Sequence, residues 1–404
     1  MGRYNINPLK ESIVFLSAIV IFFYYPVFSL CLILLLSMYL DVHPLCRIFI
    51  FSILYGFVSL YISVQDFPTA DISSYYRFIL EGGEGSYLSL KFQRLIFQYL
   101  YSTLSIPIQW YGLYCTFLLS FSLLFAMYRF SIFLGVGGVW YWATILVSML
   151  SPVDILAYEN LVAFGVSILA YSYIFEGRIK RAIFLFIFAA TFHVATIFAV
   201  FPFLVPLFFT SVSLIFVVYA LIVAIAFYYL NFSGGVSGVL ILDIILGKVY
   251  SYLFGPWSKY IRIYEYILFL MNFIKVILSF YTSYKLKSIL RSKYLLSMIN
   301  LSVIMFITLP FSALSFRVMY LWILFVPFLF YILKCEKTNF HIAIKTLYVC
   351  VLIFLSFPRF ADYYRFIPTI IMSEAMSDNV FERSLDYNYQ GVLEYRNSDG
   401  SNRE

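Results

Sequence analysis

Long unbroken apolar runs constrain the fold of this chain more than any other feature. Residues 13–40, 182–208 and 318–333 contain no acidic residue, lysine or arginine. A helix needs about 20 apolar residues to cross a bilayer, whereas the strands of a membrane barrel alternate apolar and polar residues. With 63% of its residues hydrophobic and 12% charged, the chain has too little polar surface for a soluble domain. We therefore expect an all-α polytopic membrane protein whose first apolar run is retained rather than cleaved.

Short basic connectors separate the apolar runs and predict which segments lie in the cytoplasm. They are Arg47, Arg129 and residues 176–181, 285–293 and 334–337. Cytoplasmic loops of membrane proteins are enriched in lysine and arginine, so the chain must cross the membrane an even number of times between consecutive connectors. The net charge of +7 is then mostly topological, and we expect no nucleic-acid partner.

This parity rule gives a span count and a domain organisation. We expect about 11–13 transmembrane or re-entrant helices, given about 20 residues for each crossing. They form one membrane domain, residues 1–357, which is followed by a polar C-terminal tail, residues 358–404. Full spans are expected near residues 48–64, 110–128 and 160–175.

Two polar segments between spans are predicted to lie on the external side of the membrane. They are the loops at residues 65–109 and 231–263. Within the first loop, residues 87–104 combine basic, amide and apolar side chains, which is typical of a helix lying in the outer interface. At the start of the chain, residues 13–40 are broken by Pro26, and two interpretations stay open: one tilted span or a short hairpin.

The apolar run at residues 182–208 is too long for one untilted span and too short for two ordinary ones. A single crossing here would violate the parity of the flanking connectors. The violation disappears if the run is a short hairpin that turns at residues 191–193, which places His193 near the external face. In the alternative, residues 239–245 dip into the membrane, but Asp243 interrupts that run. The hairpin is therefore the preferred prediction.

The cysteines give no sign of a disulfide framework or a metal site. They lie in apolar runs or basic connectors, without CxxC or metal-ligand spacing, at Cys31, Cys46, Cys115, Cys335 and Cys350. We expect no metal and no cofactor.

Chemistry is expected at the external face, because a charge at the bilayer centre costs about 2.5 to 3.5 kcal/mol. Basic, acidic and tyrosine side chains gather in the predicted external segments. The main candidates there are Asp71, Tyr75, Arg77, Arg94, Lys259, Arg262 and Arg317. Arginine and lysine can bind a diphosphate, while aromatic rings and carboxylates can bind sugar faces and hydroxyls. The combination suits a glycan that carries phosphate.

Each candidate also has a structural interpretation. Arg317 begins a span on the external side, against the positive-inside bias, and is either a ligand or a snorkelling anchor. Arg94 can equally contact lipid headgroups. His193 can act as a base or donor, or simply pack at a helix turn. Asp71 and Glu159 can activate a hydroxyl, or cap a loop or form a salt bridge.

Four motifs follow one another between residues 45 and 335. They are Asp-x-x-x-Tyr-Tyr at 71–76, Gly-Ser-Tyr-Leu-Ser-Leu at 85–90, Ala-Thr-Phe-His at 190–193, and a late span begun by Arg317 and Tyr320. In this order and spacing the chain resembles the bacterial polysaccharide polymerases of the Wzy type, specifically the EpsG-like branch. One departure is that Glu159 and Asn160 stand where the family often has an Arg-Gln pair, so no phosphate-binding role is carried over to that position.

The resemblance implies a polymerase, a glycosyltransferase that joins undecaprenyl-diphosphate-linked repeat units into O-antigen or a related surface polysaccharide. It implies a site on the outer side of the bacterial cytoplasmic (inner) membrane, with no nucleotide sugar or metal. The implied partners are the lipid-linked glycan, membrane lipids and a chain-length regulator. We assign His193, Asp71 and Arg317 to catalysis, and as substrate ligands Arg77, Arg94, Tyr75, Lys259 and Arg262.

Other functions fit a bundle of this kind. A flippase or other transporter of lipid-linked oligosaccharides would have charges along a central path and pseudo-repeated halves, whereas these charges cluster at one predicted face. A membrane acyltransferase that modifies the same glycans, or a ligase with a similar bundle, also remains open.

Overall fold

The computed structural model describes a subset of the chain, and every regular element in that subset is helical. The described residues are 8–22, 32–33, 43–66, 75–76, 78–80, 92–135, 158–193, 196–208, 263–288, 290, 292–309, 315 and 317–335. The all-α part of the predicted fold class is therefore confirmed for these residues. The C-terminal tail and all but the last residue of the predicted loop at 231–263 lie outside them.

The chain divides into two compact units, which are described separately here. Unit 1 consists of Met1–Glu84, Phe92–Gly165 and Ile353–Glu404, and unit 2 consists of Gly85–Lys91 and Val166–Leu352.

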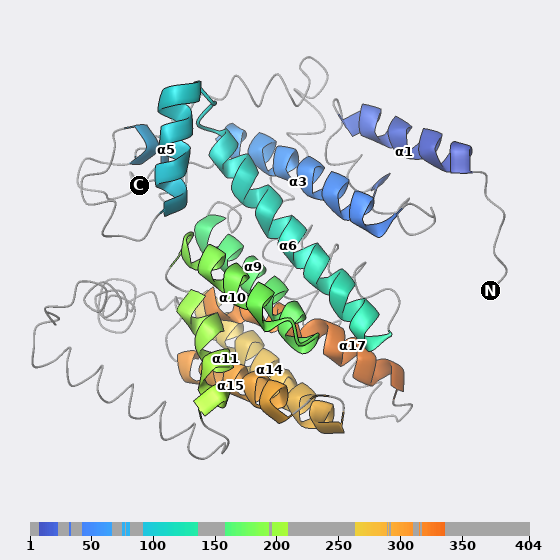
Figure 1. Ribbon diagram of the computed structural model, residues 1–404, viewed down its shortest axis with the longest axis vertical. Coiled ribbons are helices and arrows are strands. Elements are labelled where there is room, and N and C mark those ends of the chain that lie inside the picture. Colours follow the sequence, from blue (N-terminus) through green and yellow to red (C-terminus); the bar gives the residue numbers. More distant parts are fainter. Residues whose placement is uncertain are drawn as a thin grey trace, which may run out of the picture. The chain divides into compact units, whose positions relative to one another are not determined.

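Unit 1 is built around a long pair of packed helices (Figure 1). Its elements are α1 (Pro8–Phe22), α3 (Pro44–Asp66), α5 (Phe92–Leu104), α6 (Trp110–Leu134) and the first turns of α9 (Tyr158–Phe175). Helices α3 and α6 approach closely at Gly56, where a Cβ atom would lie 3.3 Å from the carbonyl oxygen of Leu113. Small residues allow such close helix contacts. Helix α6 ends at Gly135, whose φ of 60° is the left-handed conformation that glycine adopts without strain.

Unit 2 contains the rest of α9 and a second group of helices (Figure 1). They are α10 (Ile179–Ala190), α11 (Ile197–Phe208), α14 (Ile263–Lys285), η4 (Leu286–Ser288), α15 (Ser292–Thr308), η5 (Met319–Phe325) and α17 (Val326–Cys335). Helix α15 packs against both α11 and α14. The ring of Phe175, at the end of α9, contacts the rings of Tyr294 and Phe328 with centroid distances of 6.0 and 5.2 Å.

The apolar run at residues 182–208 is broken where the sequence predicts a turn. Helix α10 ends at Ala190, residues 191–193 are non-helical, and α11 begins at Ile197. The rings of Phe186 and Phe203 lie 6.1 Å apart. In a continuous helix these residues would be separated by about 25 Å, given a rise of about 1.5 Å per residue. The run therefore folds back on itself, which confirms the predicted helical break.

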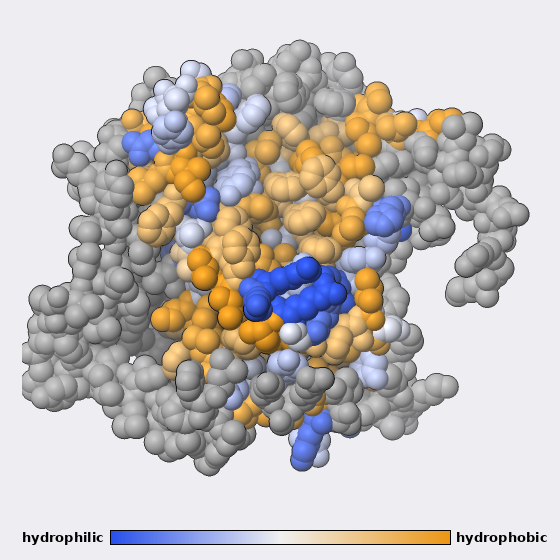
Figure 2. All heavy atoms as spheres, viewed as in Figure 1, coloured by the Kyte–Doolittle hydropathy of each residue, from blue (hydrophilic) through white to orange (hydrophobic). Residues whose placement is uncertain are grey.

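Several helices carry large apolar side chains on their exposed faces, and their buried faces combine apolar side chains with polar ones. Helix α14 shows this most clearly, because Leu270, Phe273 and Ile277 are exposed on one face while Asn272 and Ser279 are buried on the opposite face. On the face seen in Figure 2 much of the coloured surface is hydrophobic, with one large hydrophilic patch near the centre and smaller hydrophilic patches elsewhere. An apolar exposed face of this kind differs from that of a soluble helix, whose exposed face is polar.

Many buried hydroxyl groups in these helices donate to backbone carbonyls of their own helix. Thr116 donates to Gly112 O at 2.9 Å in α6, and Ser279 donates to Val276 O at 2.8 Å in α14. Such bonds satisfy a buried hydroxyl without a second helix. By length and composition, α6 is the one helix among the described residues that can cross a membrane, a test that core helices of soluble proteins also pass.

Two prolines in α11 leave a carbonyl that another helix satisfies. Pro206 has no N–H, so the carbonyl oxygen of Pro202, four residues earlier, loses its helical donor. The side-chain Nδ2 of Asn300, on α15, donates to this oxygen at 3.4 Å. A neighbouring helix commonly re-satisfies backbone groups freed by proline in an apolar setting.

This arrangement predicts a coupled pair of substitutions. Asn300→Ala should lower the stability of the purified chain by about 1–3 kcal/mol, because it leaves a buried carbonyl without a donor. In a Pro206→Ala background the new N–H can bond to the Pro202 carbonyl, so the same Asn300→Ala change should cost much less. Thermal unfolding of the four chains in detergent measures this coupling, and equal losses in both backgrounds would contradict it.

Candidate functional site

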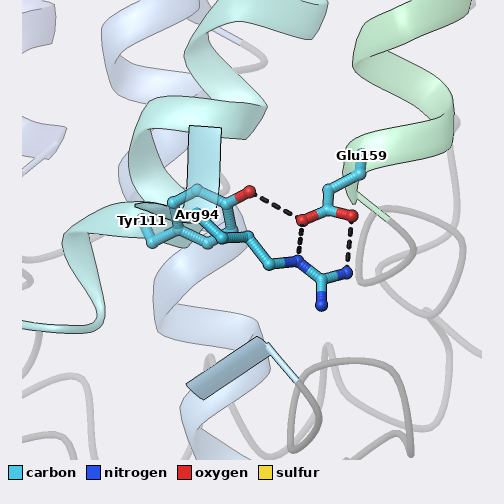
Figure 3. A network of polar contacts seen from close by, with 3 residues as sticks. All are labelled: Arg94, Tyr111 and Glu159. Atoms are coloured by element: carbon cyan, nitrogen blue, oxygen red, sulfur yellow. Dashed lines mark hydrogen bonds and ion pairs between the residues drawn. The ribbon is translucent and has the colours of Figure 1, made fainter. Parts of the chain in front are cut away.

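A buried ion pair in unit 1 joins α5 to the first turn of α9. The Nη2 atom of Arg94 donates to Oε2 of Glu159 at 2.6 Å, and its Nε donates to Oε1 of the same carboxylate (Figure 3). The two side chains are 5% and 2% exposed. The pair is bidentate, which is the geometry that favours arginine over lysine.

Aromatic side chains complete the surroundings of this ion pair. The hydroxyl of Tyr111, at the start of α6, donates to Glu159 Oε1 at 2.8 Å. The guanidinium carbon of Arg94 lies 4.3 Å from the ring centroid of Tyr75 and 5.4 Å from that of Phe78. The rings provide cation–π contact and the carboxylate receives three donors, so both buried charges are compensated.

Arg94 stays protonated in this environment. Burial lowers its pKa, but the hydrogen bonds and negative charge of Glu159 outweigh that effect and raise the pKa above the ordinary arginine value. Arg94 therefore stays a permanent cation. Its Nη1 atom points away from Glu159 (Figure 3), and among the described residues nothing bonds to it. The Nη1 amino group can therefore donate to an acceptor oxygen while Nε and Nη2 stay bonded to Glu159.

The structure brings two of the predicted site residues together and places others elsewhere. Arg94 and Tyr75 are in contact in unit 1. His193 is half-buried in the break between α10 and α11, and Arg317 is half-buried just before η5, both in unit 2. The remaining candidates lie outside the described residues: Asp71, Arg77, Lys259 and Arg262.

Sequence reasoning found part of the ion pair and missed the rest. The sequence leaves Glu159 open between a base and a salt bridge, and the structure shows the salt bridge. Tyr111 was not among the candidates, since a tyrosine in the first turn of an apolar helix gives no separate signal. Among the described residues, no group of three His, Cys, Asp or Glu side chains lies together as a metal site would require.

Comparison of the chain with protein-family models, with curated protein sequences and with solved structures finds no match. Functional inference therefore depends on the geometry and on the sequence motifs.

The ion pair predicts a large and specific loss of stability. Glu159→Gln should destabilise the chain by about 3–5 kcal/mol, because the charge of Arg94 is then buried without a partner. Tyr111→Phe should cost less, about 1.5–3 kcal/mol, since one hydrogen bond to a charged group is lost. Thermal unfolding in detergent measures both changes.

A matched control is the exposed pair of Arg178 and Glu176, whose Nε–Oε2 distance is 3.4 Å. Glu176→Gln should cost less than about 1 kcal/mol, because water screens this pair. Replacing both Arg94 and Glu159 by methionine should recover much of the loss seen for Glu159→Gln. Equal effects of the two glutamine variants would show that the buried pair is not formed.

Proposed function

We propose that this chain is a multi-pass membrane protein of the bacterial cytoplasmic (inner) membrane that polymerises surface polysaccharide. It would join undecaprenyl-diphosphate-linked repeat units into O-antigen or a related polymer on the outer side of the membrane. The observation that carries the membrane part is that α10 and α14 expose apolar faces, while α14 also buries amide, hydroxyl and ammonium groups. The polymerase part rests on the order of the sequence motifs and on a permanent cation beside aromatic rings at Arg94 and Tyr75.

The proposed reaction needs one base and a set of cations. A base, Asp71 or His193, removes the proton of an acceptor hydroxyl, whose oxygen attacks the anomeric carbon of the growing chain. The bond between that carbon and the lipid diphosphate breaks, and the diphosphate leaves with the bonding electrons. Arg317 stabilises the negative charge that develops on it. Arg94 and Tyr75, which are in contact in unit 1, are proposed as further substrate ligands.

The membrane part predicts position-dependent tolerance to charge on α14. Leu270→Asp, in the exposed apolar face, should lower the amount of membrane-inserted protein sharply, because an aspartate near a helix centre costs about 2.5 to 3.5 kcal/mol. Tyr284→Asp is the control, since this exposed residue lies at the end of α14 beside Lys285. Membrane fractionation after expression measures both. Equal tolerance at the two positions would contradict a lipid-facing surface.

The activity is tested by deleting the gene and separating surface polysaccharide on gels. A polymerase predicts loss of the long ladder while one repeat unit is retained. Loss of all repeats would instead indicate a flippase, and an intact ladder without a substituent would indicate an acyltransferase. Complementation with Arg317→Ala or with His193→Ala should leave the ladder absent or reduced more than tenfold.

The control for these variants is Arg181→Ala, which removes an exposed arginine from the first turn of α10. This variant should restore the full ladder at the same protein level. If Arg317→Ala and His193→Ala each restore it as well, the assignment of the site is wrong.

A further inference from the structure

A directional chain of hydrogen bonds in unit 2 leads from α14 to the segment that carries Arg317. The Nζ atom of Lys275 donates to Oδ1 of Asn272 at 3.3 Å. The Nδ2 atom of Asn272 donates in turn to Oγ of Ser315 at 3.2 Å. All three residues are buried, with exposures of 8%, 6% and 2%.

The chemistry of these groups fixes the direction of the chain. A lysine ammonium has three donors and no acceptor, so it must face the carbonyl side of the Asn272 amide. That contact turns the NH₂ side of the amide toward Ser315. The lone pair of the Ser315 oxygen is then used to accept, and its own hydrogen has to be donated elsewhere. The relay from Lys275 therefore ends in an O–H donor.

Among the described residues the Ser315 hydrogen has no acceptor, and at 2% exposure the hydroxyl is closed to bulk water. A buried hydroxyl hydrogen without an acceptor is costly. Two residues further along the chain, Arg317 adds a permanent cation at the start of η5. An oriented O–H donor in the same short segment as a cation is suited to an anionic oxygen.

We propose that Ser315 binds a phosphoryl oxygen of the substrate together with Arg317, and that Lys275 and Asn272 are positioning residues which aim its hydroxyl. The inference rests on the proposed function, since it assigns the donors for the lipid diphosphate. The Ser315 hydroxyl donates a hydrogen bond to the diphosphate when the bond between the anomeric carbon and the diphosphate oxygen breaks. Ser315 transfers no proton. Asn272 and Lys275 touch no substrate and act only through Ser315.

The sharpest test is Asn272→Asp, which keeps the size and shape of the side chain but reverses the direction of its hydrogen bond with Ser315. A carboxylate accepts from Lys275 with one oxygen and accepts the Ser315 hydrogen with the other, so the hydroxyl turns inward. The probe is farnesyl diphosphate, with farnesyl alcohol as the comparison for the lipid tail, bound to the full chain purified in detergent. We expect Asn272→Asp and Ser315→Ala each to weaken farnesyl diphosphate binding at least tenfold, because a hydrogen bond to a charged group is lost.

Two further variants separate this role from a packing role. Ser279→Ala removes a buried hydroxyl from the same face of α14 that donates only within its own helix, so binding should be unchanged. Ser315→Thr keeps the donor and should retain most of the binding. Melting temperatures are recorded for every variant, and Asn272→Asp should not melt earlier, since it gains an ion pair with Lys275. If Asn272→Asp does not fold, Ser315→Ala compared with Ser315→Thr decides.

The outcomes distinguish this inference from the proposed function. If Ser315→Ala or Asn272→Asp binds farnesyl diphosphate as tightly as the unaltered chain, Ser315 donates inside the protein and the inference is wrong. If the unaltered chain restores the polysaccharide ladder but does not bind the probe, the inference fails and the polymerase stands. If gene deletion leaves the ladder intact while binding still depends on Ser315, the polymerase fails and the anion site stands.

Discussion

The need to satisfy polar groups inside an apolar bundle governs this structure. In α14 the exposed face carries Leu270, Phe273 and Ile277, while the opposite face buries amide, hydroxyl and ammonium groups. Buried polar groups are tolerated only when they are hydrogen-bonded. Hydroxyls meet that need within their own helix, as Ser279 does. Longer side chains meet it between segments, so the interhelical polar contacts decide which helices stay together.

Each unit shows a different solution for a buried cation. In unit 1 the charge of Arg94 is cancelled by a bidentate carboxylate on another helix, and aromatic rings exclude water. In unit 2 the ammonium of Lys275 donates to the neutral amide of Asn272, and the amide donates in turn to Ser315. We expect the first arrangement to stabilise the fold and the second to meet an anion.

Helical class, several helix positions and the break in the run at 182–208 could be predicted from the sequence, because they follow from apolar length and from charge at the connectors. The contacts of the site could not. The pair formed by Arg94 and Glu159 joins positions far apart in the chain, and only the fold brings them together. The contact of Lys275 with Asn272 depends on which residues lie on the buried face of α14. Periodicity identifies that face, but it does not identify the partner.

The measurement that tests the central claim most directly is the accessibility of spin labels along α14 in lipid vesicles. With the native cysteines replaced, single labels would be placed at positions 270, 273 and 277 and at positions 272 and 279. If the exposed face of α14 contacts lipid, oxygen, which concentrates in lipid, should reach the labels at 270, 273 and 277. A water-soluble nickel chelate should reach none of these three labels. Labels at 272 and 279 should be protected from both reagents. If the chelate instead reaches positions 270, 273 and 277, the exposed apolar face of α14 faces water and the account of a membrane bundle is contradicted.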